Sequence, residues 1–116
     1  MLKVKWDLEE AVALYDLYRQ TGCTLNVPKK ELENLSIIFR KRSKMLGLKV
    51  DDKFRNLSGL RMQIGCIHYV VTDGREGLSN TGTLFYQVDD LFHTKPEIYR
   101  MILNEFYQKY LNFDAE

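Results

Sequence analysis

The chain has 116 residues, of which 45% are hydrophobic and 28% charged, with two prolines and seven glycines. This length suits one domain, and the composition excludes a disordered chain and argues against a β-sandwich with many turns. The net charge of +1 gives no preference for a polyanionic or cationic partner, and no apolar run reaches the roughly 18 residues of a membrane span. Because the first ten residues are also too acidic for a signal peptide, we expect a cytoplasmic protein with no membrane contact.

Two helices are predicted in the first half of the chain. Asp7 can cap the first helix, with Glu10 as the reciprocal partner three residues later, and the helical spacing of apolar residues ends near Thr21. Pro28 suits the first turn of a second helix. Gly47 is a suitable residue to follow its end.

The next segment fits two patterns. Apolar residues from Asn56 to about Tyr69 fall at helical spacing and predict a helix. Part of the same segment alternates as a strand would, so a short β hairpin near 67–76 is kept as an alternative. After the helix we expect an extended piece and a turn at Asp73-Gly74.

Two further helices are predicted towards the C-terminal end. A fourth helix is expected to begin near Ser79 or Asn80, and a fifth has the pattern of a capping box between Thr94 and Glu97, with a proline in its first turn. The predicted fold is therefore mainly α, a single compact domain of about five helices over residues 1–116.

Signatures of catalysis and metal binding are missing from this sequence. A zinc site would need both cysteines and both histidines, but neither a Cys-x-x-Cys nor a His-x-x-x-His pattern occurs. The glycines form neither a dinucleotide fingerprint nor a phosphate loop. Cys23 and Cys66 are expected to be thiols in a reducing cytosol, and a Cys–His nucleophile pair stays open because such partners meet only in the fold. We predict a non-enzymatic protein with no catalytic residue, metal or cofactor.

Positive charge is concentrated between residues 38 and 62, where eight basic residues accompany two aspartates. Lys and Arg neutralise phosphates, and side-chain amides read base edges, so this segment is a candidate DNA contact. The candidate nucleic-acid-binding residues are Arg40, Lys41, Lys44, Lys53, Arg55, Asn56, Arg61 and Gln63.

Two of these candidates have a structural alternative. Asn56 is equally well explained as the cap of the helix that follows it. For Arg55 we favour a phosphate at the helix start. The alternative is an ion pair with Glu9 or Glu10.

Four stretches occur in a characteristic order: WDLEEAVALYDLY, ENLSIIFR, KFRNLSGLRMQIG and EGLSN. In this order they resemble a small domain at the N-terminus of HNH-type restriction endonucleases, also found in other bacterial and phage-encoded proteins linked to restriction and defence. The resemblance spans Trp6 to Tyr110, and Phe-Arg-Asn with its following glycine is the most specific part. The matching positions are Trp6, Glu9, Glu10, Leu14 or Leu17, Tyr18, Leu35, Ser36, Phe54, Arg55, Asn56, Gly59, Leu60, Gly77, Leu78 and Ser79.

This resemblance implies a non-catalytic role. In such enzymes a separate HNH domain cuts DNA, and its His-Asn-His motif does not occur in these 116 residues. The implied function is a module that binds or targets double-stranded DNA in restriction or phage defence. The alternative is a phage-encoded inhibitor that binds and blocks a host defence nuclease, such as a CRISPR effector.

A third hypothesis is a homodimer formed through the C-terminal helix, which holds more aromatic residues than one buried face requires. These aromatic residues are Tyr99, Phe106, Tyr107, Tyr110 and Phe113.

Overall fold

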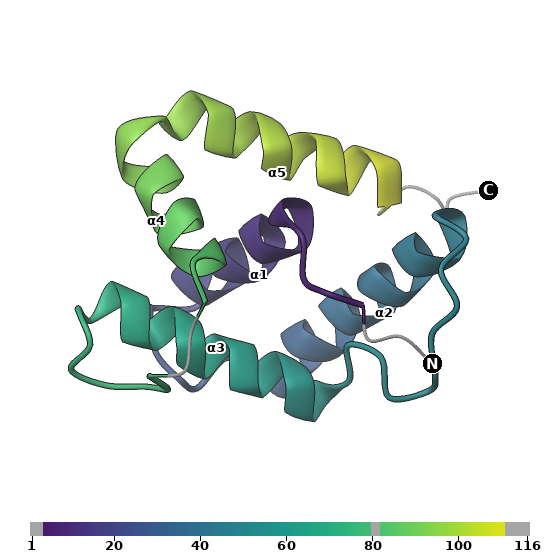
Figure 1. Ribbon diagram of the computed structural model, residues 1–116, viewed down its shortest axis with the longest axis horizontal. Helices are drawn as coiled ribbons and strands as arrows, with labels where there is room; N and C mark the ends of the chain where they lie inside the picture. Colours follow the sequence, from purple (N-terminus) through teal and green to yellow (C-terminus); the bar gives the residue numbers. More distant parts are fainter. Residues whose placement is uncertain (1–3, 80–81, 111–116) are drawn as a thin grey trace.

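The computed structural model describes residues 4–79 and 82–110, and these ranges hold five helices and no strand (Figure 1). The helices are α1 (Leu8–Gln20), α2 (Lys29–Met45), α3 (Leu57–Val71), α4 (Leu84–Thr94) and α5 (Pro96–Tyr110). The prediction of a compact fold with five helices is confirmed. None of the described helices is long and apolar enough to cross a membrane.

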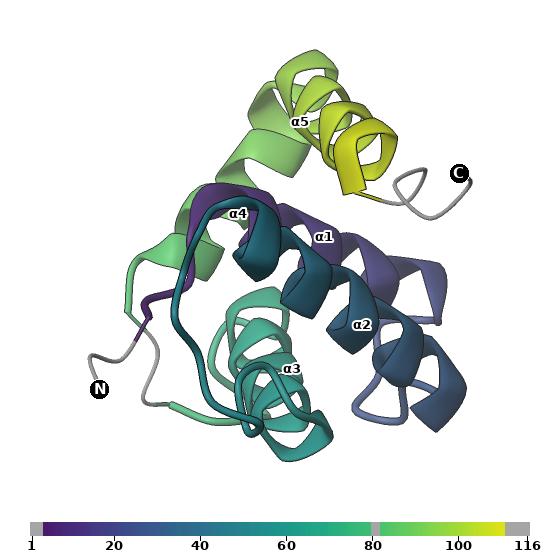
Figure 2. The same ribbon diagram turned by 90° about the vertical axis from the view of Figure 1, so that its right-hand side faces the viewer.

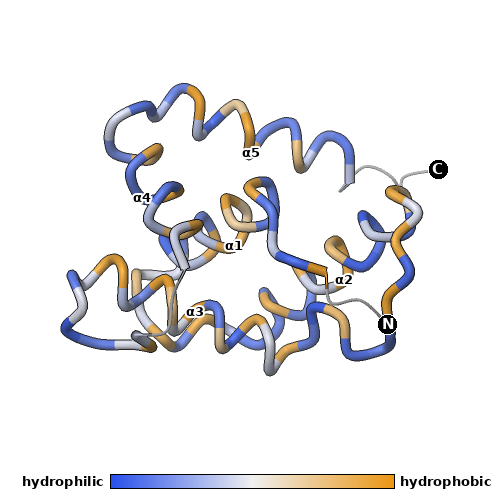
Figure 3. Tube along the Cα trace, in the orientation of Figure 1, coloured by the Kyte–Doolittle hydropathy of each residue, from blue (hydrophilic) through white to orange (hydrophobic). Residues whose placement is uncertain are grey.

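Helix α1 is the centre of the molecule. Residues 11–15 are fully buried and cover every side of the helix, as expected for an interior helix. α1 contacts each of the other four helices and lies between α3 and α5 (Figures 1 and 2). Buried side chains close the core around it, including Phe39 from α2, Ile67 from α3 and Phe106 from α5. Apolar and hydrophilic positions recur along each helix, which gives each outer helix one face for this core (Figure 3).

The predicted start of α1 and the predicted end of α2 are confirmed, whereas Pro28 precedes α2 instead of lying in its first turn. The Asp7 carboxylate accepts from the backbone N–H of Glu10 at 3.0 Å, and the Glu10 carboxylate accepts from the backbone N–H of Asp7, which completes a capping box. α2 begins directly after Pro28. Gly47 follows the end of α2 with a φ of +71°, a conformation that glycine adopts without strain.

The alternative of a short β hairpin near 67–76 is wrong, and so is the extended piece expected after Tyr69. α3 continues to Val71 and is followed at once by the turn at Asp73-Gly74, whose φ angles are +54° and +81°. The strand-like alternation arises because residues 64–68 are all buried, so the apolar residues of α3 are not confined to one face.

The last two helices follow each other with only Lys95 between them. Thr94 belongs to α4, and its hydroxyl donates to the Asp90 carbonyl at 2.8 Å, so the capping box predicted at Thr94 is wrong. α4 begins at Leu84, later than the predicted start at Ser79; Asn80 lies outside the described residues.

Candidate functional site

Arg55 is an internal ion-pair residue. Its Nε donates to Oε2 of Glu10 at 2.8 Å, and its Nη2 donates to Oε1 of the same carboxylate at 2.9 Å. Only 8% of the Arg55 side chain and 2% of the Glu10 side chain are exposed. The structural alternative is confirmed. Because the carboxylate neutralises the guanidinium through two hydrogen bonds, Arg55 is not available to a phosphate.

Two aromatic rings enclose the Arg55 guanidinium. Its central carbon lies 4.5 Å from the ring centroid of Trp6 and 4.3 Å from that of Phe54. Its Nη groups also donate to the backbone carbonyls of Val4 and Lys5. Arg55 therefore connects the segment before α1, α1 itself and the loop before α3.

Asn56 is the cap of α3. Its Oδ1 accepts from the backbone N–H of Gly59 at 2.9 Å, which confirms the capping alternative. One residue earlier, the Arg55 carbonyl accepts from the Ser36 hydroxyl at 2.6 Å and so binds the loop to α2. The Trp-x-x-Glu-Glu, Leu-Ser and Phe-Arg-Asn elements of the sequence pattern therefore meet in one internal network.

The stretch EGLSN, which contains the Gly-Leu-Ser element of the same pattern, has a structural role in the loop after α3. The Glu76 carboxylate lies 2.8 Å from Nε2 of His68, and the Leu78 backbone N–H donates to the Gly65 carbonyl at 3.0 Å. Between them, Gly77 has a φ of +96° and lies so close to α3 that an added Cβ would be 2.4 Å from the Gly65 oxygen. This part of the pattern is explained by packing of the loop on α3.

Two more arginines of the basic segment have internal partners. Arg42 is buried and its Nη2 donates to Asp7 at 2.7 Å and to Glu9 at 2.9 Å. Burial lowers the pKa of Arg42, but the hydrogen bonds to these carboxylates outweigh it and raise the pKa overall. Arg40 donates to the Phe54 carbonyl at 2.6 Å, a neutral partner that does not offset the guanidinium charge.

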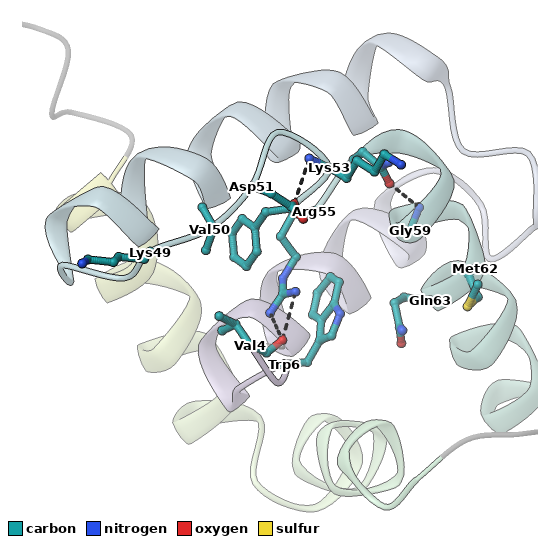
Figure 4. Close-up of a pocket in the computed structure, with 12 residues that line it drawn as sticks. Val4, Trp6, Lys49, Val50, Asp51, Lys53, Arg55, Gly59, Met62 and Gln63 are labelled. Carbon is teal, nitrogen blue, oxygen red and sulfur yellow. Dashed lines mark hydrogen bonds between the residues drawn. The ribbon is translucent and has the colours of Figure 1, made fainter. Parts of the chain in front are cut away.

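Most of the remaining positive charge of the basic segment lies around two adjoining open cavities, each of about 560 Å³. We call the first the Trp6 cavity; its lining includes Val4, Trp6, Val50, Phe54, Met62 and Gln63, with Lys49 and Lys53 (Figure 4). We call the second the α2 cavity; its lining includes Ile37, Arg40, Lys41, Lys44 and Leu48. Both cavities also share Lys49 and Val50, and together they form what we call the basic face.

The structure brings most of the predicted site residues to this face. Four of the eight border the Trp6 cavity (Lys53, Arg55, Asn56 and Gln63) and three border the α2 cavity (Arg40, Lys41 and Lys44). Arg61 is exposed on α3 and borders neither cavity.

The basic face also carries exposed apolar side chains, which the charge analysis missed. Ile37 is 50% exposed and Leu48 38% exposed, and both line the α2 cavity. Met45 and Leu46 at the end of α2 are similarly exposed. The sequence held a signal for this surface: Ile37 lies four residues before Lys41 and seven before Lys44, so an apolar residue shares the basic side of the helix.

The residues considered for catalysis lie apart from this face. His68 is buried in α3, where Nδ1 lies 2.7 Å from the Tyr18 hydroxyl. Burial raises the pKa of Tyr18 to about 12. Both cysteines are free thiols, Cys66 buried and Cys23 half-buried. Within residues 4–79 and 82–110, no group of three or more His, Cys, Asp or Glu side chains is arranged to hold a metal ion.

The aromatic residues of α5 are largely used within the molecule. Tyr99, Phe106 and Tyr110 are buried in the core and Tyr107 is half-buried, while Phe113 lies outside the described residues. The aromatic excess that suggested a homodimer is therefore explained by packing of α5 on α1, α2 and α4.

Searches for similar proteins found no matching family model, no similar curated protein and no similar solved structure.

Proposed function

We propose that this chain is a non-enzymatic protein-binding module that docks through its basic face on an acidic partner surface. The observation that carries the proposal is the mixture of side chains there: exposed Ile37 and Leu48 beside Lys44 and Lys49. Exposed apolar clusters with a polar rim are typical of protein interfaces. DNA-binding surfaces are more polar and much more positive.

The internal ion pair of Arg55 with Glu10 weakens the DNA hypothesis further, because it removes one of the predicted phosphate contacts. The eight basic residues of the segment suggested a strong electrostatic attraction for DNA. Two of them, Arg42 and Arg55, are paired internally with carboxylates. Asp51 and Asp52 are exposed in the loop that joins the two cavities and oppose the remaining charge. Few phosphate contacts give weak binding that salt removes.

Double-stranded DNA remains the second candidate, because seven predicted residues border one face. The sequence resemblance to domains of HNH-type restriction endonucleases makes a nuclease the first partner to examine under the leading proposal. In that setting the chain would act as a module or an inhibitor that occupies the nuclease.

The proposal is tested by quantitative co-purification from the organism that encodes the chain. Wild type is compared with Lys44→Ala/Leu48→Ala on the basic face and with Lys30→Ala, which changes an exposed lysine at the other end of α2. We expect at least one protein that is retained by wild type and the control and lost by the double variant. In parallel, labelled duplex DNA is titrated at low and physiological salt.

Two results would overturn the protein-binding proposal. One is a set of co-purified proteins that does not depend on Lys44 and Leu48. The other is duplex binding that persists at physiological salt and is lost in the double variant, which would favour the DNA candidate.

A further inference from the structure

The Trp6 cavity has the construction of a side-chain pocket. Val4 and Trp6 belong to the segment before α1, whereas Met62 and Gln63 project from α3 (Figure 4). The Trp6 ring is fixed by an edge contact with Phe39 at 5.5 Å and by the Arg55 guanidinium on its face. Pockets lined by a rigid aromatic ring and other apolar side chains commonly bind the anchor side chain of a protein partner.

The charges around this cavity favour an acidic occupant. Lys49 and Lys53 are exposed and border it, and the positive end of α3 begins beside them at Asn56. Asp51 also borders the cavity and keeps its negative charge, because a hydrogen bond from the neutral backbone N–H of Lys53 at 3.0 Å does not neutralise a carboxylate; two lysines against this one aspartate leave the rim positive. The Arg55 charge is neutralised by Glu10.

We propose that the Trp6 cavity binds one large apolar side chain, carried by an acidic segment of the protein partner whose neighbouring carboxylates pair with Lys49 and Lys53. This inference rests on the proposed function and names the chemistry recognised at its site. The α2 cavity, which shares Lys49, extends the same face and accommodates the continuation of that segment.

Trp6 supplies the measurement, because it is the only tryptophan in the sequence. Its fluorescence is followed during titration with short peptides of aspartates around one phenylalanine, up to millimolar concentration. Two further peptides carry alanine in place of phenylalanine or lysines in place of the aspartates. A single-stranded oligothymidylate of equal charge represents a nucleic-acid occupant. We expect saturable binding of the acidic phenylalanine peptide and at least about tenfold weaker binding of the other three ligands, as expected for loss of one good contact.

Matched variants locate the site. Lys53→Ala and Arg61→Ala each remove one exposed positive charge, but only Lys53 borders the cavity; Met62→Ala and Met101→Ala each remove one exposed apolar side chain, but only Met62 borders it. We expect binding to weaken by about tenfold for the first member of each pair and to stay within twofold for the second, in line with the effect of one interface contact.

Equal binding of the phenylalanine and alanine peptides would overturn the inference, as would preferential binding of the oligothymidylate. Absence of any peptide binding at millimolar concentration would do the same, yet would leave the proposed function standing if co-purification still depends on Lys44 and Leu48. If the peptide binds but no co-purified protein depends on Lys44 and Leu48, the proposed function is wrong.

Discussion

The two arginines at positions 55 and 61 show how differently one residue type is used in this molecule. Arg55 is paired with the almost fully buried Glu10, whereas Arg61 is exposed on α3. Removing one member of a buried ion pair leaves the other charge without compensation, which costs far more than losing an exposed charge. Arg55 therefore stabilises the fold.

We expect Arg55→Ala to lower the free energy of unfolding by about 3–5 kcal/mol, and Arg61→Ala to change it by less than about 0.5 kcal/mol. Urea denaturation followed by circular dichroism measures both values. Equal and small effects would show that the guanidinium of Arg55 is exposed in solution.

Buried tyrosines predict a loss of stability in alkali. Burial raises the pKa of Tyr18 to about 12, and it also raises the pKa values of Tyr15 and Tyr99. The unfolded chain has tyrosine pKa values near 10, so it releases these protons first. Their stabilising contribution is complete below about pH 10 and is lost as the pH rises towards 12.

Urea midpoints measured across that interval should fall steadily for wild type, and more gently for Tyr18→Phe, which has one such group fewer. A flat wild-type profile between about pH 10 and 12 would be inconsistent with buried tyrosine hydroxyls.

Among the elements, the loop after α3 makes a very close backbone contact, because Gly77 packs directly against the backbone of α3. Gly77 combines a positive φ with a backbone contact that leaves no room for a side chain, whereas Gly82 has open space around it. We expect Gly77→Ala to destabilise the protein by about 2 kcal/mol or more, since backbone strain and overpacking add. Gly82→Ala is the matched control and should have an effect close to zero.

Amide hydrogen exchange would locate the effect of Gly77→Ala. Its expected signature is faster exchange of the Leu78 amide, which donates to the Gly65 carbonyl. If Leu78 stays as protected as in wild type, the loop does not pack on α3 as described.

Helix starts and stops were predictable where the signal is local. The Asp7–Glu10 box and the glycine after α2 act through neighbouring backbone groups, so sequence spacing is sufficient to find them. The proline predicted in the first turn of α5 is its first residue, Pro96, but the capping box at Thr94 was wrong because the Thr94 hydroxyl has a competing acceptor inside α4, the Asp90 carbonyl. The hairpin alternative failed because five consecutive residues of α3, 64–68, are all buried, which blurs the helical period in that part of the sequence.

The candidate site was less predictable than the fold, because the position of a charged residue in the sequence does not by itself show which group it pairs with in the folded molecule. Arg42 was counted as surface charge, and for Arg55 the ion pair with Glu9 or Glu10 was only the alternative to a phosphate contact; the carboxylates that pair with both arginines come from α1 or its cap, more than thirty positions away. Conversely, the spacing of Ile37 from Lys41 and Lys44 placed an apolar residue on the basic side of α2, a signal that an analysis of charge alone does not use, and the folded molecule shows Ile37 exposed beside the lysines.

At the scale of the whole molecule, the sequence pattern serves mainly the internal network, whereas the lysines of the basic face lie outside the pattern. Five pattern residues also border the Trp6 cavity: Trp6, Phe54, Arg55, Asn56 and Gly59. Trp6, Glu10, Ser36 and Arg55 hold the N-terminal segment, α1, α2 and the loop before α3 together. The lysines and exposed apolar side chains lie around the two cavities on the outside. Other chains that share the pattern are therefore expected to share the fold, while their partners depend on the surface residues.

A double-mutant cycle between Arg55 and Glu10 tests this separation most directly. The free energy of unfolding is measured for wild type, Arg55→Gln, Glu10→Gln and the double variant. We predict a large cost for each single variant and a coupling energy of at least about 1.5 kcal/mol, as found for close buried charge pairs. A coupling near zero would mean that Arg55 does not pair with Glu10 in solution, and would return it to the exposed surface as a phosphate contact.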